Sequence, residues 1–292
     1  YCSTIRIHWG GTIWSMGTLC QAIEIDTIGY ADACVLQSSL AAELAAGKRS
    51  ECILLLQHPH TYTLGSSARH EHLLYTDDQL IHYDIVVCET DRGGGITYHG
   101  PGQLVGYPIL DLGSLYMDES HTFTSDYISY IRKLEVMLIN ILRGYGIESM
   151  QVPGLTGVWV ESCVSTNGQF TSCKSTDLPR KIGSIGVRVD KNGISQHGFA
   201  LNVDIQDSYF EGIVPCGLEG YGTISMSEVL ADVPTIQDVQ STVICEFGRM
   251  FDKEMISSGN SNFNCIITDH FSNKLDIDYF FIVEFKDGGM IS

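Results

Sequence analysis

The chain has 292 residues, of which 44% are hydrophobic and 18% charged, so it can bury the core of one large domain or two modest ones. Its formal net charge of −18 argues against a nucleic acid as partner, because phosphate contacts need clustered lysines and arginines. No apolar run approaches the roughly 18 residues of a membrane-spanning helix. The ten cysteines show no C-x-x-C spacing, which favours a reducing compartment over a secreted disulfide framework.

The first part of the chain predicts a short extension, a helix and a strand. Residues 1–27 contain a single arginine and no acidic residue before Glu24, a composition that faintly resembles a transit peptide. From Tyr30 to Ala46, leucines recur every fourth residue and Gly47 follows as a C-cap, which predicts an amphipathic helix. The apolar run 52–56 then predicts a buried strand.

A glycine-rich polar segment, 92–103, lies between two apolar runs that predict strands, 85–88 and 104–110. Its three adjacent glycines, 93–95, would let the backbone approach a ligand closely, because glycine has no Cβ. Around them stand a cation, a hydroxyl, a phenol and an imidazole, which are Arg92, Thr97, Tyr98 and His99. The segment therefore predicts a loop that places a substrate, although a solvated glycine-rich hairpin is the ordinary alternative.

The same residues do not fit a phosphate-binding loop. Gly93 and Gly95 begin a G-x-G pattern, but Tyr98 stands where the third glycine would be, and a strand follows rather than a helix. Dinucleotide and nucleoside-triphosphate loops both need the glycine turn to open a helix whose N-terminus holds the phosphate. We therefore exclude both kinds of site.

The second half of the chain predicts two further helices and two segments outside the core. Apolar residues at helical spacing mark 128–142 and 235–251. The stretch 161–179 is rich in serine, threonine and glycine and predicts an exposed loop or insertion. Residues 252–292 have a weaker pattern that ends in a strand-like run, 279–283, so we expect a C-terminal extension.

A predicted β-hairpin carries two side chains of chemical interest. The strand-like runs 180–189 and 194–203 flank the pair Asn192-Gly193, which is typical of a tight hairpin turn. Lys181 stands near the start of the first run and His197 in the second. Taken singly, each has an ordinary structural explanation, since a lysine at a strand start is usually solvated and a strand histidine is often simply hydrogen-bonded.

Cys216 is predicted to lie on a turn, because Pro215 precedes it and Gly217 follows it. A sulfur on a turn can be presented rather than packed, whereas the ordinary position of a free cysteine is the core. Cys163 and Cys173 are the closest pair of cysteines. They lack partner ligands nearby in the sequence, so they do not predict a metal site.

Four motifs in this order together resemble the lipoyl(octanoyl)transferase family of lipoate biosynthesis. They are 92–103 with its continuation 107–112, 181–189, 197–203 and 215–217. The earlier run 54–65 resembles the family's N-terminal motif, and the resemblance covers roughly residues 28–251. The chain departs from the family where His60 replaces a common second proline, where 161–179 looks like an insertion, and where 252–292 lack a counterpart in short members.

The resemblance implies an α/β fold of the α+β type. In this fold a mixed or antiparallel sheet is flanked by helices, as in the catalytic domain of biotin- and lipoate-protein ligases. We therefore expect an N-terminal extension at 1–27 that could be a targeting remnant, a catalytic domain at 28–251 with a loop insertion at 161–179, and a C-terminal extension at 252–292.

The reaction implied by the resemblance moves an octanoyl group to a lysine of a lipoyl domain through a thioester on a cysteine. Carried over, Cys216 is the nucleophile, Lys181 favours its thiolate and later accepts a proton, and His197 would support the pair. We expect oxyanion donors among the backbone N–H groups near Cys216 and Gly217 or on the side chain of His99. The acyl pocket would be lined by Arg92, Gly93, Gly94, Gly95, Ile96, Thr97, Tyr98, His99, Ser184, Ile185, Gly186, Gly198, Phe199 and Ala200.

The implied donor is octanoyl-acyl carrier protein, and the implied acceptors are lipoyl domains of 2-oxoacid dehydrogenase subunits and the H protein of glycine cleavage. No cofactor, metal, nucleic acid or membrane is expected, and the compartment would be the mitochondrion in a eukaryote and the cytoplasm otherwise. Two alternatives stay open, an ATP-using lipoate- or biotin-protein ligase of the same fold and a non-catalytic relative that only binds carrier or lipoyl domains. The ligase would leave Cys216 without a role, and the presence of both Lys181 and Cys216 argues against the non-catalytic relative.

Overall fold

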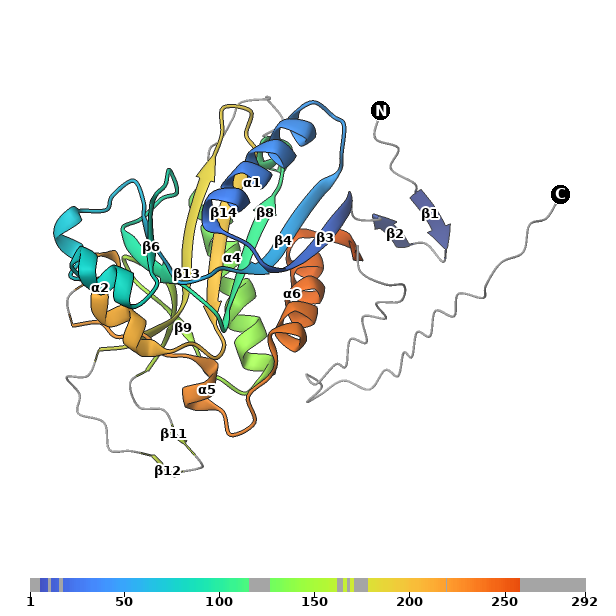
Figure 1. Ribbon diagram of the computed structural model, residues 1–292. Helices are drawn as coiled ribbons and strands as arrows, with labels where there is room; N and C mark the ends of the chain where they lie inside the picture. Colours follow the sequence, from blue (N-terminus) through green and yellow to red (C-terminus); the bar gives the residue numbers. More distant parts are fainter. Residues whose placement is uncertain are drawn as a thin grey trace. The chain divides into compact units, whose positions relative to one another are not determined.

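The computed structural model describes residues 6–9, 12–15, 18–115, 127–161, 165–166, 169–170, 178–218 and 220–257 (Figure 1). The chain divides into two compact units, 1–261 and 262–292, and every described residue belongs to the first. The predicted strand at 279–283, the greater part of 161–179, and both Cys163 and Cys173 lie outside the described residues. In the described part of the chain, no helix is long and apolar enough to cross a membrane.

An eight-stranded mixed sheet forms the centre of the described structure (Figure 1). Its strands follow the order β15-β3-β4-β8-β14-β13-β10-β9. Their bounds are β3 (Thr18–Thr27), β4 (Glu51–Gln57), β8 (Gln103–Ile109), β9 (Met150–Val152), β10 (Leu155–Val160), β13 (Arg180–Val189), β14 (Ser195–Asn202) and β15 (Lys253–Ser257). The pairs β15–β3 and β3–β4 are parallel and the others antiparallel, which confirms the predicted fold class.

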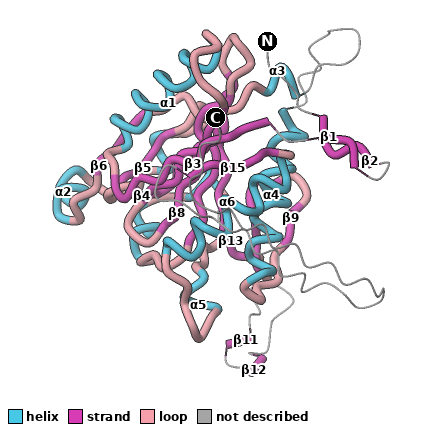
Figure 2. Tube along the Cα trace, turned by 90° about the vertical axis from the view of Figure 1, so that its right-hand side faces the viewer, coloured by secondary structure: helices cyan, strands magenta, loops and turns pink. Residues whose placement is uncertain are grey.

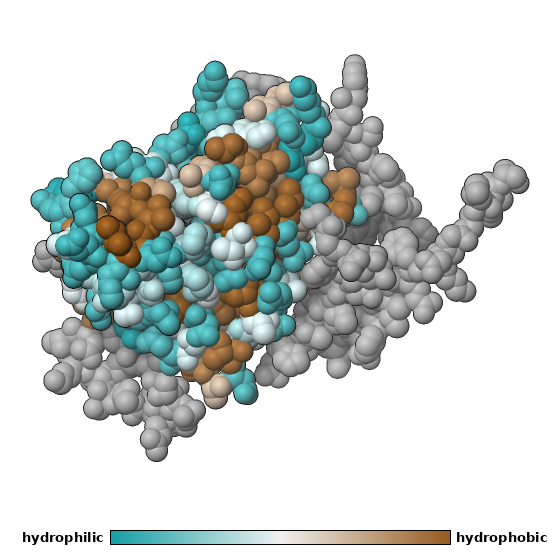
Figure 3. Space-filling model, viewed as in Figure 1, coloured by the Kyte–Doolittle hydropathy of each residue, from teal (hydrophilic) through white to brown (hydrophobic). Residues whose placement is uncertain are grey.

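Helices cover both faces of this sheet. Helix α1 (Tyr30–Ala45) lies on one face, and α4 (Tyr127–Gly144) and α6 (Ile236–Phe251) lie on the other. Figure 2 shows the strands between α1 and the α4–α6 pair. In Figure 3, apolar side chains gather near α1 and near β6, in keeping with exposed Val35 and Val86.

Strand β4 shows why the sheet can be buried on both faces. Ile53 and Leu55 belong to the apolar cluster of α4 and α6, whereas Leu54 and Leu56 pack in the cluster that contains Leu40 of α1. Successive side chains of a strand point to opposite faces, so a strand with two buried faces is a continuous apolar run in the sequence. The predicted buried strand at 52–56 is therefore confirmed.

A second, three-stranded sheet has the order β6-β5-β7. Its strand β7 belongs to the glycine-rich segment. Strand β5 pairs in parallel with β6 and in antiparallel with β7. The elements of this region are β5 (Thr61–Leu64), β6 (Val86–Glu89), β7 (Ile96–His99), α2 (Asp77–His82) and the 3-10 helices η1 (His70–His72), η2 (Asp207–Gly212) and η3 (Pro215–Gly217). Apolar side chains of β5, β7 and η2 form a separate cluster, so this region has a small core of its own.

The predicted helices and the hairpin are confirmed by α1, α4, α6 and the β13–β14 pair. Helix α6 begins at a capping box in which Thr235 and Asp238 exchange side-chain and backbone hydrogen bonds. The hairpin turn contains Gly193 at φ +79°, a conformation that favours glycine. The remaining elements are β1 (Arg6–Trp9), β2 (Thr12–Ser15), α3 (Leu112–Leu115), β11 (Ser165–Thr166), β12 (Gln169–Phe170) and α5 (Met226–Val229).

Two strands of the central sheet, β3 and β15, lie entirely outside residues 28–251, the range that the sequence predicts for the catalytic domain. The side chain of Lys253, at the start of β15, forms an almost fully buried ion pair with Glu51 and donates to Thr18 Oγ1 at 2.7 Å. The other carboxylate oxygen of Glu51 accepts from Asp111 N at 3.0 Å. These contacts join the edge strand β15 to the middle of the sheet.

Candidate active site

Arg92 holds the glycine-rich loop in its shape. Its guanidinium is buried and donates to the carbonyl of Thr63 at 2.7 Å, to Thr63 Oγ1 at 2.8 Å, to the carbonyl of Gly95 at 2.8 Å and to that of Gly93 at 3.0 Å. All these acceptors are neutral oxygens of β5 and of the loop itself. Arg92 therefore binds the loop to β5, while its stem lines the cavity described below.

The glycine residues of the loop allow it to lie directly on β13. Gly93 N donates to the carbonyl of Val187 at 3.0 Å, and Gly94 has φ +90°. A Cβ on Gly186 would lie only 2.8 Å from the carbonyl oxygen of Gly93. The close backbone approach predicted from the sequence thus takes place between the loop and a strand.

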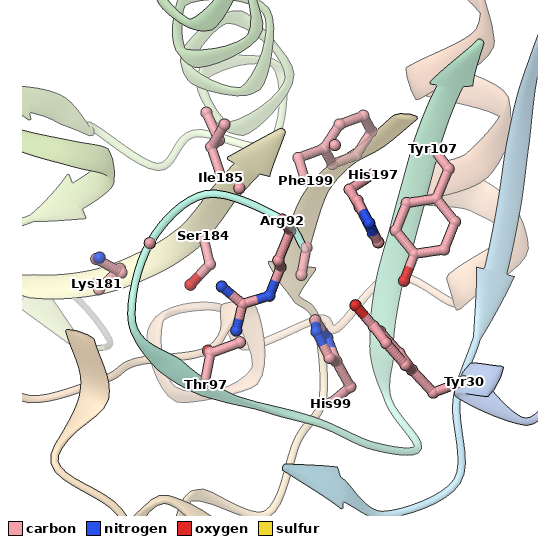
Figure 4. A pocket seen from close by; sticks show the side chains of 14 residues that line it. Tyr30, Arg92, Thr97, His99, Tyr107, Lys181, Ser184, Ile185, His197 and Phe199 are labelled. Carbon is pink, nitrogen blue, oxygen red and sulfur yellow. The ribbon is translucent and has the colours of Figure 1, made fainter. Parts of the chain in front are cut away.

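A cavity lies between this loop, β13, β14 and α1 (Figure 4). Its lining residues are Tyr30, Arg92, Gly94, Thr97, His99, Tyr107, Lys181, Ser184, Ile185, Gly186, His197, Gly198, Phe199 and Ala200. Three of the four sequence motifs, 92–103 with 107–112, 181–189 and 197–203, therefore contribute to one cavity, although their residues are far apart in the chain. Tyr30 and Tyr107 were not among the predicted lining residues.

Four of the predicted lining residues, Gly93, Gly95, Ile96 and Tyr98, are not part of the lining. In β7, Thr97 and His99 line it, whereas Ile96 and Tyr98 pack in the small core of the three-stranded sheet. Tyr98 OH also forms a hydrogen bond of 2.8 Å with the Nδ1 of His60. Because successive side chains of a strand point to opposite sides, the four consecutive residues 96–99 cannot all line the cavity.

The inner wall of the cavity consists of aromatic and imidazole rings. His58 Nδ1 donates to the carbonyl of Ile28 at 2.7 Å, so its Nε2 accepts from Tyr107 OH at 2.8 Å. Tyr30 stacks on His99, with ring centroids 5.8 Å apart. This wall is polar in composition, but its groups are hydrogen-bonded within the protein, since Tyr30 OH donates to Thr90 Oγ1 at 3.2 Å and His99 Nδ1 bonds to Gln103 Oε1 at 2.7 Å.

Burial keeps the histidines of this wall uncharged. It lowers the pKa of His58 to about 4, although the hydrogen bond to the carbonyl of Ile28 opposes the shift. Burial, followed by the neighbouring His58 and Arg92, lowers the pKa of His99 well below its usual value. The pKa of His197 is also lowered, mainly by burial, against the opposing effect of Asp91. The wall is therefore neutral at pH 7, which suits an uncharged ligand.

We expect the free energy of unfolding to fall as the pH drops from about 6.5 to about 4. His58 takes up a proton readily only when unfolded, so acid favours the unfolded chain, and a shift of 2 to 3 pKa units corresponds to about 3 kcal/mol. Urea unfolding at several pH values measures this slope. In His58→Gln the slope should be smaller, while a variant of the exposed His82 should match the wild type. An equal slope in wild type and His58→Gln would contradict the assignment.

His197 lies on the far side of Arg92 from Lys181, next to Tyr107 (Figure 4). Its Nε2 contacts Asp91 Oδ1 at 3.0 Å, and its own backbone N–H donates to a buried glutamine side chain at 2.6 Å. The residue has φ +57°, a strained conformation for a side chain of this size. The structure therefore places His197 with the aromatic wall, and its predicted support of the Cys216–Lys181 pair stays a prediction.

Lys181 lies in a narrow slot at the opposite end of the cavity. The residue is 7% exposed, and its Nζ lies 4.5 Å from the centre of the Trp159 ring, which is a cation–π contact. Gly157, at φ +121°, forms the side of the slot, and a Cβ there would come within 3.2 Å of the Lys181 Cε. The ammonium group is thus held within the protein rather than solvated.

Backbone hydrogen bonds anchor both ends of the loop that carries Cys216. At its start, Val214 N donates to the carbonyl of His72 at 2.8 Å. At its end, Lys181 N donates to the carbonyl of Gly222 at 2.9 Å. Cys216 itself belongs to η3, and its side chain lies outside the described part of the structure. The predicted turn is confirmed, and Lys181 pairs with the same loop at Gly222, six residues after Cys216.

Two expected oxyanion donors are already engaged. Gly217 N donates to the carbonyl of Val214 at 3.0 Å within the turn. His99 Nδ1 donates to Gln103 Oε1 at 2.7 Å, because the amide nitrogen of Gln103 donates to Asn202 and to the carbonyl of Tyr98. A neutral His99 with its proton on Nδ1 has none on Nε2. The donors predicted at Gly217 and His99 are therefore not available in this arrangement.

The fold and this cavity define a catalytic domain of the lipoate-ligase class. The family model described as the lipoyl protein ligase A/B catalytic domain matches residues 29–248. An octanoyltransferase from Solibacter usitatus is 40% identical over 81% of this chain and 95% of its own length, and one from Chloroflexus aggregans is 38% identical over 79% and 94%. The chain belongs to the octanoyltransferase family within this class of catalytic domain.

Solved structures show the same fold at low sequence identity. The bipartite lipoate protein ligase of Thermoplasma acidophilum has a TM-score of 0.57 and 16% identity, over 82% of this chain and 88% of its own. A lipoate-protein ligase A bound with ATP has a TM-score of 0.53 and 17% identity, over 83% and 90%. The predicted similarity to the catalytic domain of lipoate ligases is confirmed.

Proposed function

We propose that this protein transfers an octanoyl group from octanoyl-acyl carrier protein to a lysine of lipoyl domains, through a thioester on Cys216. The acceptors would be the lipoyl domains of 2-oxoacid dehydrogenase subunits and the H protein of glycine cleavage. The single observation that supports the thioester is the direct backbone pairing of Lys181 with the end of the Cys216 loop, at one end of a cavity whose aromatic and imidazole wall is neutral. The name of the curated relatives, octanoyltransferase, supports the choice of acyl group.

In the first half-reaction, the Cys216 thiolate, stabilised by the Lys181 ammonium, attacks the thioester carbonyl of the donor. The carrier thiolate leaves, takes the proton from the Lys181 ammonium and departs as a thiol, and the octanoyl group remains on Cys216. An adjacent ammonium favours the thiolate, which is the nucleophilic form of cysteine. The position of Lys181 on the strand that pairs with the loop suits this role.

In the second half-reaction, the amine of the acceptor lysine attacks the Cys216 thioester. Lys181 accepts a proton from the attacking nitrogen, an amide forms, and the Cys216 thiolate leaves next to the resulting ammonium. Both protein substrates then use the same cavity in turn, as a ping-pong scheme requires. Ile185, Phe199 and Ala200 provide apolar contact for the chain of the acyl group.

A transfer that starts from a thioester needs no nucleotide, because the thioester already carries enough group-transfer potential to form an amide. We therefore expect the purified protein to modify a lipoyl domain with octanoyl-acyl carrier protein when ATP and magnesium are absent. We expect no modification from free octanoate or lipoate, even with ATP. Modification that occurs only with free acid and ATP would establish the ligase alternative instead.

A further inference from the structure

The segment at the end of η1 pairs with the chain just before Cys216. Leu74 N donates to the carbonyl of Gly212 at 2.8 Å, and Val214 N donates to that of His72 at 2.8 Å. Between these two bonds, Leu73 and Ile213 form an antiparallel bridge. The backbone of His72 is therefore fixed relative to the start of the Cys216 loop.

The imidazole of His72 lies directly against the turn that holds Cys216. A Cβ on Gly217 would lie 2.6 Å from the Cε1 of His72, 3.2 Å from its Nε2 and 3.3 Å from its Nδ1. These three atoms form the N–C–N edge of the ring, so both ring nitrogens face the turn. Gly217 has φ +68° and no side chain, and it thereby leaves room for the ring.

The Nδ1 of His72 is buried and has no hydrogen-bond partner among the described residues. A buried polar atom without a partner is destabilising, so such atoms are rare and often belong to functional sites. Cys216 is the neighbour of Gly217 in this turn, and its side chain lies outside the described part of the structure. A thiol or thiolate is a suitable partner for an imidazole nitrogen.

The other charged groups near His72 are accounted for. Arg69, just before η1, and Glu71, within it, pair with each other at 3.3 Å and are exposed. Glu211 belongs to η2 and is exposed. The backbone of Lys181 binds the other end of the loop, at Gly222. The segment bonded to each end of the loop thus carries one basic side chain, which is His72 at the start and Lys181 at the end.

We propose that His72 is a positioning residue of the acyl-transfer site, whose imidazole binds the Cys216 thiol. This inference depends on the proposed role of Cys216. The imidazole hydrogen bond aims the sulfur, and a protonated imidazole stabilises the thiolate. His72 therefore extends the range in which Cys216 is reactive toward lower pH, where imidazole is charged.

The test is the rate at which iodoacetamide alkylates Cys216 in the full chain between pH 5.5 and 9, followed by mass spectrometry of the peptide that contains Cys216. In His72→Gln the rate at pH 6 should fall about tenfold, while the rate at pH 9 should stay within about twofold of the wild type. The matched control is His70→Gln, because His70 belongs to the same 3-10 helix and is exposed. This control should reproduce the wild-type profile, and an identical profile in His72→Gln would overturn the proposal.

A second measurement keeps the proposal testable if His72→Gln does not fold. NMR titration of the histidine ring signals in the wild type and in Cys216→Ala compares His72 with and without the thiol. The titration midpoint of His72 should differ between the two proteins, whereas that of His70 should not. An unchanged midpoint for His72 would refute the contact. Neither measurement requires turnover, so this proposal can fail while octanoyl transfer itself is confirmed.

Discussion

Cys216→Ala should reduce octanoyl transfer by about four orders of magnitude or more, because it removes the atom to which the acyl group would be attached. The variant should fold, since Cys216 lies in a three-residue turn that backbone hydrogen bonds hold at both ends. Transfer is measured as octanoylation of a lipoyl domain by mass spectrometry, and folding by the urea unfolding curve.

The control for this variant is Cys88→Ala. Cys88 is a free, half-buried cysteine on β6 and does not line the cavity, so its replacement should leave transfer nearly unchanged. Substantial transfer by Cys216→Ala would contradict the covalent scheme and would leave direct attack of the acceptor lysine on the carrier thioester as the alternative.

Lys181→Met should reduce transfer by about 10² to 10⁴. Methionine keeps an unbranched apolar side chain in the slot between Gly157 and Trp159, so the loss reports mainly on the ammonium group. Without this charge the thiolate of Cys216 is less favoured, and the alkylation of Cys216 should require a higher pH than in the wild type.

Lys191→Met is the matched control, because Lys191 is exposed in the turn of the same hairpin. It should change neither transfer nor the pH dependence of alkylation. If Lys181→Met alkylates with the wild-type pH profile, the ammonium does not act on the thiol, and the lysine would serve the second half-reaction alone.

The sequence predicted the residues of the cavity well where local patterns carry the information. Arg92, Gly94, Thr97 and His99, with the strand segments 184–186 and 198–200, line one cavity because these motifs depend on backbone that approaches closely. Ile96 and Tyr98 could have been excluded from the lining by strand alternation alone. The prediction treated the motif as one continuous run and did not take into account that successive side chains of a strand point in opposite directions.

Other features depend on contacts between distant segments, which no local pattern encodes. Tyr30 lies at the start of α1 and Tyr107 in β8, and they reach the cavity only because the sheet brings these elements together. The guanidinium of Arg92 was expected to place a substrate, but it binds the carbonyls of its own loop and of β5. The contact of His72 with the Cys216 turn likewise follows from backbone pairing between distant segments.

The most direct test of the covalent scheme is the intact mass of the protein after incubation with octanoyl-acyl carrier protein in the absence of an acceptor. We expect the mass to increase by one octanoyl group, less the thiol hydrogen, and peptide mapping should locate the added group on Cys216. Hydroxylamine should remove it, and adding a lipoyl domain should transfer it to the acceptor lysine. An unmodified protein that nevertheless octanoylates the lipoyl domain at full rate would contradict the thioester on Cys216.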